Sequence, residues 1–196
     1  MRNIFIIHGS NGSPQENWFP WLKKELEKLG HRVFVPQFQV PKIPAPGGHK
    51  LNLWLKEFEK YKKYLNKDTV IIAHSRGCTF TLQLLPTIGI KIKGLFLVGP
   101  PIDYDQWRPD VYIEYDSFQA RPYLWKRIRQ LANHIEVFQS TDDVIPISEG
   151  QFIADNLHAK INIIKNAGHF NTYTYKKFVK FPLLLKKIRG LISKNP

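Results

Sequence analysis

The sequence predicts an α/β fold, a three-layer α/β/α sandwich around a doubly wound, mostly parallel sheet of about six strands. Short β-branched or aromatic runs alternate with longer helical stretches, which is the pattern of βαβ units. The length of 196 residues fits one domain with a sizeable core, and we expect that domain to span 1–196. Hydrophobic residues make up 43% of the chain and aromatic residues 13%, a composition typical of a folded globule.

Six short runs rich in β-branched and aromatic residues predict the strands of this sheet. They are Ile4–Ile7, Arg32–Val35, Thr69–Ala73, Gly94–Val98, Ile135–Gln139 and Ile161–Ile164.

The first helix is predicted from Trp18, Leu22, Leu26 and Leu29, which fall on one helical face. Pro20 would break a helix that began at Ser13, so we expect a separate first turn and a main helix that starts near Asn17. Further helices are predicted at Leu51–Leu65, Arg76–Leu85, Ser148–Leu157 and from about Tyr173 with a kink or restart at Pro182, and a loop at Pro36–Lys50.

Composition also limits the setting and the partners. A single cysteine excludes an internal disulfide and agrees with a reducing compartment. We find no signal-peptide pattern at the N-terminus and no apolar span of about 18 residues, so we predict a cytoplasmic protein with no membrane span. The formal net charge is +13, and the segment from Asn171 to Pro196 contains seven Lys or Arg and no acid. A solvated helix face explains this basic tail most simply, and nucleic acid is not an expected partner despite the basic surface.

The stretch "IIAHSRGC" at 71–78 places Ser75 between an apolar run and a helical segment. A serine there is either a turn residue or the nucleophile of a hydrolase, held on a strained strand-to-helix turn. The usual fingerprint of that turn is G-x-S-x-G. Gly77 supplies one small flanking residue, and Ala73 replaces the other glycine with only one extra methyl group.

An acid and a histidine follow in the order that such a nucleophile requires. The run "STDDVIP" places Asp142 and Asp143 after the fifth strand, and "KNAGHFN" places His169 after the sixth. Hydrolases of this architecture carry the triad in the chain order Ser, Asp, His, each on a loop beyond the carboxyl end of a strand. The simpler interpretations are an acidic turn and a surface histidine, but the order and placement together favour a catalytic triad. We expect His8 and His74 to have structural roles.

The segment "HGSNGS" at 8–13 is the candidate oxyanion hole, because a glycine-rich turn after the first strand exposes backbone N–H groups. The N–H of Ser10 or Asn11 would act together with that of Arg76, the residue after the nucleophile. The segment lacks G-x-G-x-x-G spacing, Walker A spacing is absent, and the histidines form no metal-site pattern. We therefore expect no cofactor and no metal.

Together, "HGSNGSPQENWFPWLKKELEKLG", "VIIAHSRG", "ARPYLWKRI", "STDDVIP" and "NAGHFN" resemble the small serine hydrolases typified by retinoblastoma-binding protein 9 and bacterial YdeN. The resemblance spans nearly the whole chain and implies a compact α/β-hydrolase fold without a large cap domain. It implies Ser75 as nucleophile, His169 as base and one aspartate of the pair as the orienting acid. Mammalian members are described as binding the retinoblastoma protein through L-x-C-x-E, and this sequence lacks that motif.

The acidic loop is one residue shorter than the usual pattern of these hydrolases, so two alignments of it are open. Counting back from Ile145-Pro146 selects Asp142, whereas matching the "STDD" string directly to the mammalian relative selects Asp143. We favour Asp142, because its distance from the strand end also suits the wider superfamily.

The predicted activity is hydrolysis of a small ester, thioester or amide, with a small molecule or short peptide as substrate. The segment 100–121 follows the fourth strand and should overhang the site, with Trp107 and Phe118 as candidate pocket residues beside Tyr104, Tyr112 and Tyr115. Five acids in the same segment hint at a cationic substrate group, although a solvated acidic loop explains them equally well. The alternatives are acyl transfer to an acceptor other than water, and a non-catalytic binding protein on a hydrolase scaffold that uses its basic surface for polyanions.

Overall fold

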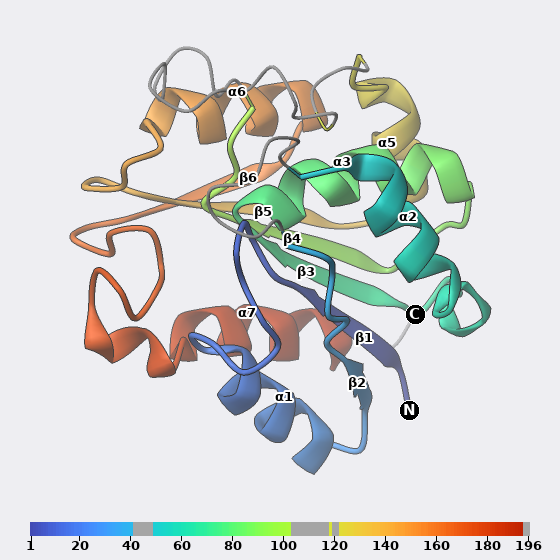
Figure 1. The fold of residues 1–196 in the computed structure, drawn as a ribbon, viewed down its shortest axis with the longest axis horizontal. Helices are drawn as coiled ribbons and strands as arrows, with labels where there is room; N and C mark the ends of the chain where they lie inside the picture. The colour runs from blue at the N-terminus through green and yellow to red at the C-terminus, as the bar shows by residue number, and fades with distance from the viewer. Residues whose placement is uncertain (41–48, 103–117, 119–121, 194–196) are drawn as a thin grey trace.

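The computed structural model describes residues 1–40, 49–102, 118 and 122–193. Its centre is a sheet in which every described strand pairing is parallel, with the order β2-β1-β3-β4-β5-β6 (Figure 1). The strands are β1 (Asn3–Ile7), β2 (Arg32–Phe34), β3 (Val70–His74), β4 (Gly94–Val98), β5 (Ile135–Ser140) and β6 (Lys160–Ile164). All six predicted strands are confirmed, with ends that shift by at most one residue.

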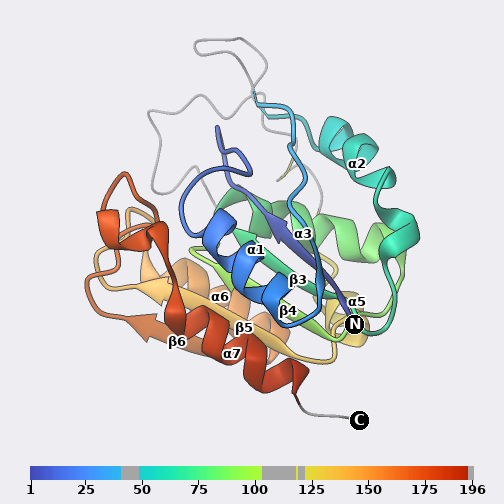
Figure 2. The ribbon, with the colours of Figure 1, turned by 90° about the horizontal axis from the view of Figure 1, so that it is seen from below.

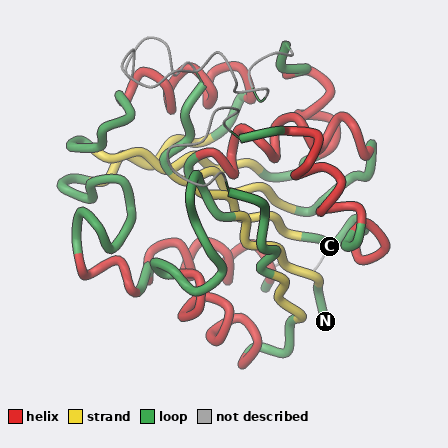
Figure 3. Tube along the Cα trace, viewed as in Figure 1, coloured by secondary structure: helices red, strands yellow, loops and turns green. Residues whose placement is uncertain are grey.

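Helices cover both faces of this sheet (Figures 1 and 3). One face carries α1 (Phe19–Lys28) and α7 (Pro182–Ile192), as the view from below also shows (Figure 2). The other face carries α2 (Leu51–Glu59), α3 (Arg76–Ile88), α5 (Trp125–Leu131) and α6 (Ile147–Leu157). Two short 3₁₀ segments, η1 (Lys62–Tyr64) and η2 (Lys176–Val179), complete the described elements. The predicted three-layer α/β/α arrangement is confirmed.

The sheet separates two hydrophobic clusters. Every residue of β3 and β4 is buried, because helices pack on both faces of these central strands. Phe5, Ile71 and Leu97 face the cluster beneath α2, α3, α5 and α6. Ile6 and Ile72 face the cluster beneath α1 and α7. The period of two along each strand thus assigns alternate residues to opposite layers.

The helix prediction needs correction at three points. Helix α1 begins at Phe19, so Pro20 lies in its first turn, where the missing N–H has no intrahelical partner to lose. Helix α5 was not predicted, because only two of its seven residues, Ile128 and Leu131, are buried and leave almost no periodic signal. The predicted helix at Leu51–Leu65 is divided, since α2 ends at Glu59 and η1 follows.

The topology brings the carboxyl ends of β1 and β3 together. From β1 the chain turns outward to β2 and then returns to β3 on the other side of β1, so the winding direction reverses between β1 and β3. Ligands of open α/β sheets bind at such a reversal, beyond the carboxyl ends of the strands. The "HGSNGS" segment follows β1 and Ser75 follows β3, so both candidate motifs lie at this point. None of the described helices combines the length and apolar character that a bilayer crossing requires.

Candidate active site

Ser75 occupies a sharp turn between β3 and α3. Its backbone has φ 53° and ψ −127°, a conformation that costs a non-glycine residue on the order of 1–3 kcal/mol. The surrounding bonds hold it there: its N–H donates to the Val98 carbonyl at 2.9 Å, and its own carbonyl accepts from the Cys78 N–H at 2.8 Å. Strain of this kind gathers at functional sites, and this turn gives Ser75 the backbone of a nucleophile elbow.

Two glycines allow the first loop to approach this turn. A Cβ on Gly77 would lie 2.6 Å from the carbonyl oxygens of both Ile7 and His8, and a Cβ on Gly9 would lie 2.7 Å from the Ser75 Cβ. Side chains at these two positions are therefore sterically excluded. Ala73, which stands at the other position of the elbow fingerprint, is fully buried within β3, where its methyl group is accommodated.

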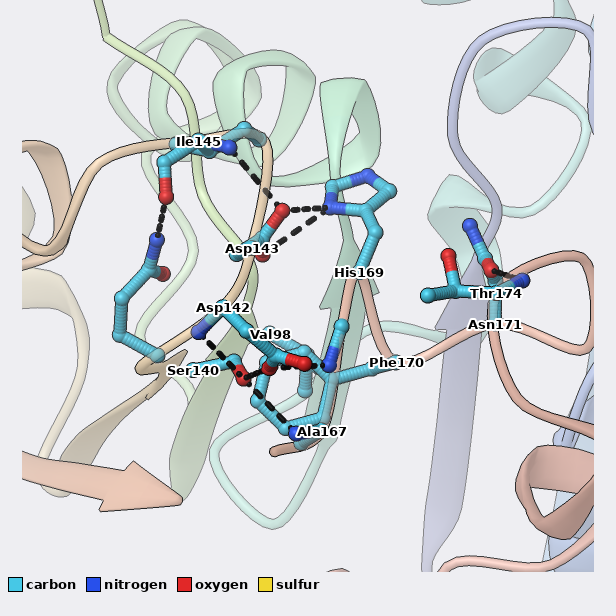
Figure 4. A network of polar contacts seen from close by, with 12 residues as sticks. Val98, Ser140, Asp142, Asp143, Ile145, Ala167, His169, Phe170, Asn171 and Thr174 are labelled. Atoms are coloured by element: carbon cyan, nitrogen blue, oxygen red, sulfur yellow. Dashed lines mark hydrogen bonds and ion pairs between the residues drawn. The ribbon is translucent and has the colours of Figure 1, made fainter. Parts of the chain in front are cut away.

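The structure places Asp143, and not the favoured Asp142, against His169 (Figure 4). The Asp143 carboxylate accepts from His169 Nδ1, with its two oxygens 2.9 and 3.1 Å away, and its side chain is fully buried. It also accepts the Ile145 N–H at 3.0 Å, which fixes the carboxylate in the turn. Because Nδ1–H donates to the carboxylate, Nε2 is left as the acceptor nitrogen of the ring.

Asp142 points elsewhere, so the expectation that favoured it is corrected. Its carboxylate accepts from Ser140 Oγ at 2.6 Å, from the Gly168 N–H at 2.8 Å and from the Tyr175 hydroxyl at 2.7 Å. These donors, with Ser140 first, stabilise the ionised carboxylate and lower the pKa of Asp142 to about 2. Consecutive side chains leave a turn in different directions, so Asp142 contacts the backbone of the loop that carries His169 while Asp143 contacts the ring.

His74 and Trp18 hold the same loop from the opposite side. His74 Nε2–H donates to the His169 carbonyl at 2.8 Å, and Trp18 Nε1–H donates to the Phe170 carbonyl at 3.0 Å. Burial, together with the charge His169 acquires on protonation, lowers the pKa of His74 to about 3, so this imidazole is neutral. These bonds give His74 the structural part expected of it.

His8 shapes the loop after β1. Its Nε2 accepts the Phe38 N–H at 3.0 Å, so its Nδ1 carries the proton that the Gly9 carbonyl accepts at 2.8 Å. The ring is fully buried, and burial lowers its pKa. Both ring nitrogens are used in holding backbone, so His8 also has the structural part expected of it.

The candidate oxyanion residues lie together beside Ser75. Arg76 is the first residue of α3, and its Nε–H donates to Ser10 Oγ at 2.7 Å. Asn11 follows with a φ of +52°, which turns the loop sharply after Ser10. The positive end of the α3 dipole therefore lies at Ser75, beside the backbone of the first loop.

Ser75 and His169 line one cavity of about 380 Å³, together with Gly9, Ser10 and His74. The contacts of these residues include no hydrogen bond between Ser75 Oγ and the His169 ring. Catalytic hydrogen bonds of hydrolases are often long before substrate binds and shorten in the complex.

The rest of the cavity wall was missed in the sequence. Apart from Gly12 of the first motif, it comes from residues next to the two motifs: Glu16, Asn17, Phe19, Asn171, Thr172, Tyr173 and Lys176. Asn17 Oδ1 accepts the Thr172 N–H at 3.0 Å and so joins the two walls. The signal that could have found them is adjacency, since each lies within eight residues of His8–Ser13 or His169.

The predicted aromatic pocket stays a prediction, because neither of its two candidate residues is among the described residues that line the cavity. Trp107, the other aromatics of 103–117 and the acidic cluster lie outside the described residues. Phe118 is fully buried rather than exposed to the cavity, with its ring centroid 5.1 Å from that of Trp54 and 5.3 Å from the Arg76 guanidinium carbon. Among the described residues, no three His, Cys, Asp or Glu side chains group closely enough to hold a metal ion.

Comparison with known proteins supplies the family. The chain is 28% identical to "Putative hydrolase YdeN" of Bacillus subtilis (strain 168) over 197 residues, which cover 99% of this chain and 98% of that protein. It is 28% identical to "Serine hydrolase RBBP9" of Rattus norvegicus over 180 residues, which cover 89% of this chain and 90% of that protein.

Solved structures agree with the fold. The crystal structure of the B. subtilis ydeN gene product superposes with a TM-score of 0.86 at 27% identity, covering 99% of this chain and 100% of that one. Est1E from Butyrivibrio proteoclasticus, solved with ferulic acid bound, has a TM-score of 0.74 at 15% identity, covering 99% and 90%. The second likeness speaks for the fold alone, and both agree with the predicted compact α/β-hydrolase fold. The profile of the family described as "Serine hydrolase" matches residues 4–187, and the chain therefore belongs to the serine hydrolase family.

Proposed function

We propose that this serine hydrolase cleaves a small ester, thioester or amide through Ser75, His169 and Asp143, by way of an acyl-enzyme. One observation carries the proposal: a serine in a strained elbow and a histidine bound to a buried carboxylate line the same cavity. A nucleophile, its base and the group that orients the base are the parts that acyl transfer needs.

The proposed reaction begins when His169 Nε2 removes the proton from Ser75 Oγ as Oγ attacks the substrate carbonyl carbon. The carbonyl oxygen becomes an oxyanion, which the N–H groups of Arg76 and of Ser10 or Asn11 would bind. His169 then gives its proton to the leaving group as the bond to carbon breaks, which leaves the acyl group on Ser75. Water, deprotonated by His169, hydrolyses this ester and restores the serine.

The cavity supports a small and partly polar substrate. A volume of about 380 Å³ is near the lower end of ligand sites, which range over roughly 300–1,000 Å³. Asn17, Asn171 and Lys176 offer hydrogen-bonding groups along its wall. Ser75, whose Oγ would attack the substrate carbonyl, lines the same cavity. A small acyl or leaving group with polar substituents suits this lining.

A fluorophosphonate probe tests the proposal, because it modifies only an activated serine. Wild-type protein should be labelled, and the label should disappear in Ser75→Ala. Rates on p-nitrophenyl esters of graded chain length, compared with aminoacyl amides, would then define the acyl group. A folded wild-type protein that takes no label, and that instead binds polyanions in a salt-sensitive way, would contradict the proposal and favour the binding-protein alternative.

A further inference from the structure

Two short segments of the site, Ser140–Asp143 and Asn166–His169, are joined by hydrogen bonds in which every residue of both segments takes part. The last residue of β5 and the three residues after it contact four consecutive residues of the loop that carries His169, and Figure 4 shows the contacts of Ser140, Asp142 and Asp143. Thr141 Oγ1 accepts the Asn166 N–H at 3.1 Å, Ser140 Oγ accepts the Ala167 N–H at 2.9 Å, Asp142 accepts the Gly168 N–H at 2.8 Å, and Asp143 accepts His169 Nδ1–H at 2.9 Å. Only the last of these contacts reaches the proposed catalytic ring. The other three hold the backbone that leads to it.

Asp142 is the most heavily bonded member of this set. One carboxylate oxygen accepts both the Ser140 hydroxyl and the Gly168 N–H, and the other accepts the Tyr175 hydroxyl. Gly168 precedes His169 directly, whereas Tyr175 lies six residues after it. The carboxylate therefore ties together the two ends of the segment 168–175.

The backbone around His169 needs such external support. Gly168 and Phe170 have φ values of +52°, so left-handed residues flank the histidine on both sides. A Cβ on Gly168 would lie within 3 Å of the Thr174 side chain, so the segment folds closely back on itself. The carbonyls of His169 and Phe170 are bonded to His74 and Trp18 on the far side. On the opposite side of the segment, the Asp142 carboxylate holds the Gly168 N–H and the Tyr175 hydroxyl.

We propose that Asp142, with Tyr175, is a positioning residue for His169, acting through the Gly168 backbone, while Asp143 acts on the ring itself. The inference rests on the proposed function, because it assigns a part in the reaction of Ser75. Neither Asp142 nor Tyr175 lines the cavity, so neither touches a substrate bound there. Their loss should therefore lower kcat by displacing His169, with KM unchanged within about twofold.

The two aspartates are then distinguished by what each must supply. Asp142 needs only to accept hydrogen bonds from Gly168 and Ser140, which the carbonyl oxygen of an asparagine also does. Asp143 must in addition stabilise the imidazolium, which requires a charge. Rescue by asparagine should thus succeed at position 142 and fail at position 143.

The experiment compares Asp142→Ala, Asp142→Asn, Tyr175→Phe and Asp143→Asn on one p-nitrophenyl ester, with thermal unfolding measured for each. Asp142→Ala should lower kcat by roughly 10- to 100-fold, the effect of one lost hydrogen bond to a charged group. Asp142→Asn should recover most of that loss, and Tyr175→Phe should lower kcat by about fivefold. Asp155→Ala is the matched control and should leave kcat unchanged, since this exposed side chain on α6 is bonded to Gln151 alone among the described residues.

A folded Asp142→Ala protein with the kcat of the wild type would overturn the inference. If that variant fails to fold, wild-type kcat in Tyr175→Phe decides against it in the same way. Equal loss in Asp142→Asn and Asp142→Ala would also overturn it, since the charge of Asp142 would then be required. Failure of the proposed function is distinguishable from failure of this inference. If the proposed function is wrong, Ser75→Ala will keep the ester hydrolysis and the probe labelling of the wild type.

Discussion

Asp143 Oδ1 lies 2.9 Å from His169 Nδ1, and the aspartate side chain is fully buried beneath the histidine ring. In the proposed reaction, this contact sets the tautomer in which Nε2 can accept a proton from Ser75. An asparagine would remove the charge that stabilises the imidazolium, and its NH₂ group would replace one of the two carboxylate oxygens that contact Nδ1. We expect Asp143→Asn to lower kcat on the order of 10⁴-fold, measured by steady-state ester hydrolysis. A loss below tenfold in a folded variant would remove Asp143 from the triad.

Gly9 leaves space for the nucleophile, so Gly9→Ala should damage both stability and rate. The new methyl group would lie 2.7 Å from the Ser75 Cβ and 3.2 Å from its Oγ, against a turn that cannot move freely. We expect a loss of about 1–3 kcal/mol in the free energy of unfolding from overpacking. Displacement of Oγ should lower kcat on the order of 10²-fold.

Gly190→Ala is the matched control for this substitution. Gly190 lies in α7, and a Cβ there would meet nothing within 4 Å. Alanine should raise the free energy of unfolding by about 0.5–1 kcal/mol through helix propensity, with kcat unchanged. Urea unfolding and ester hydrolysis measure both variants, and a Gly9→Ala protein with wild-type rate would contradict the close approach.

The strands were predictable and the choice of aspartate was not, for different physical reasons. Runs such as Val70–His74 are buried on both faces, so their composition alone marks them. The side-chain directions of Asp142 and Asp143 depend on the backbone of one turn and on partners as distant as Tyr175. The two alignments of the acidic loop therefore selected different aspartates, and the sequence alone could not decide between them.

The residues of the cavity wall could not be predicted from the sequence for a similar reason. The sequence directs attention to the aromatic segment after β4, whereas the described wall joins Asn17 to Thr172, which lie 155 positions apart. Each residue is ordinary in its local context, and only the sheet order brings them together. That Ser75 and His169 lie close together was predictable, because their motifs are local and the carboxyl ends of parallel strands meet at one edge of the sheet.

The lowered pKa of His49 predicts how the free energy of unfolding changes with pH. Burial, followed by the charge of Arg76, lowers its pKa to about 3, from an unfolded value near 6.5. The unfolded chain therefore binds a proton that the folded chain does not between these pH values, so stability is full above about pH 6.5 and falls as pH drops toward 3. The slope for one such histidine reaches about 1.4 kcal/mol per pH unit. The stability that Asp142 contributes through its pKa of about 2 is full above about pH 3.8 and is lost as pH falls toward 2.

His49→Leu should reduce that slope by about one proton. The Nδ1 atom of His49 is buried with no hydrogen-bond partner among the described residues, so leucine removes a poorly satisfied polar atom. Urea unfolding between pH 4 and 8 measures the effect. The two proteins should differ in slope from pH 4 to 6 and have the same slope from pH 7 to 8. Parallel curves over the whole range would contradict a neutral buried His49.

Glu136 joins β5 to its neighbours at the end of the sheet opposite the site. Its buried carboxylate accepts from Lys187 on α7 at 3.2 Å, from Asn162 on β6 at 2.9 Å and from His134 at 3.0 Å. Burial opposes its ionisation, but these donors outweigh burial and hold the pKa of Glu136 below its usual value. The ionised carboxylate therefore depends on its cationic neighbours.

Lys187→Met should lower the free energy of unfolding by about 1–2 kcal/mol, because one donor to a buried carboxylate is lost while the aliphatic stem is kept. The value is at the low end for a charged hydrogen bond because the lysine side chain is 26% exposed and partly screened by water. Lys186→Met is the matched control, since the adjacent lysine is exposed and forms no ion pair among the described residues. It should change stability by less than about 0.5 kcal/mol. Ester hydrolysis should be unchanged in both variants, and equal unfolding free energies would show that the Lys187 pair adds nothing.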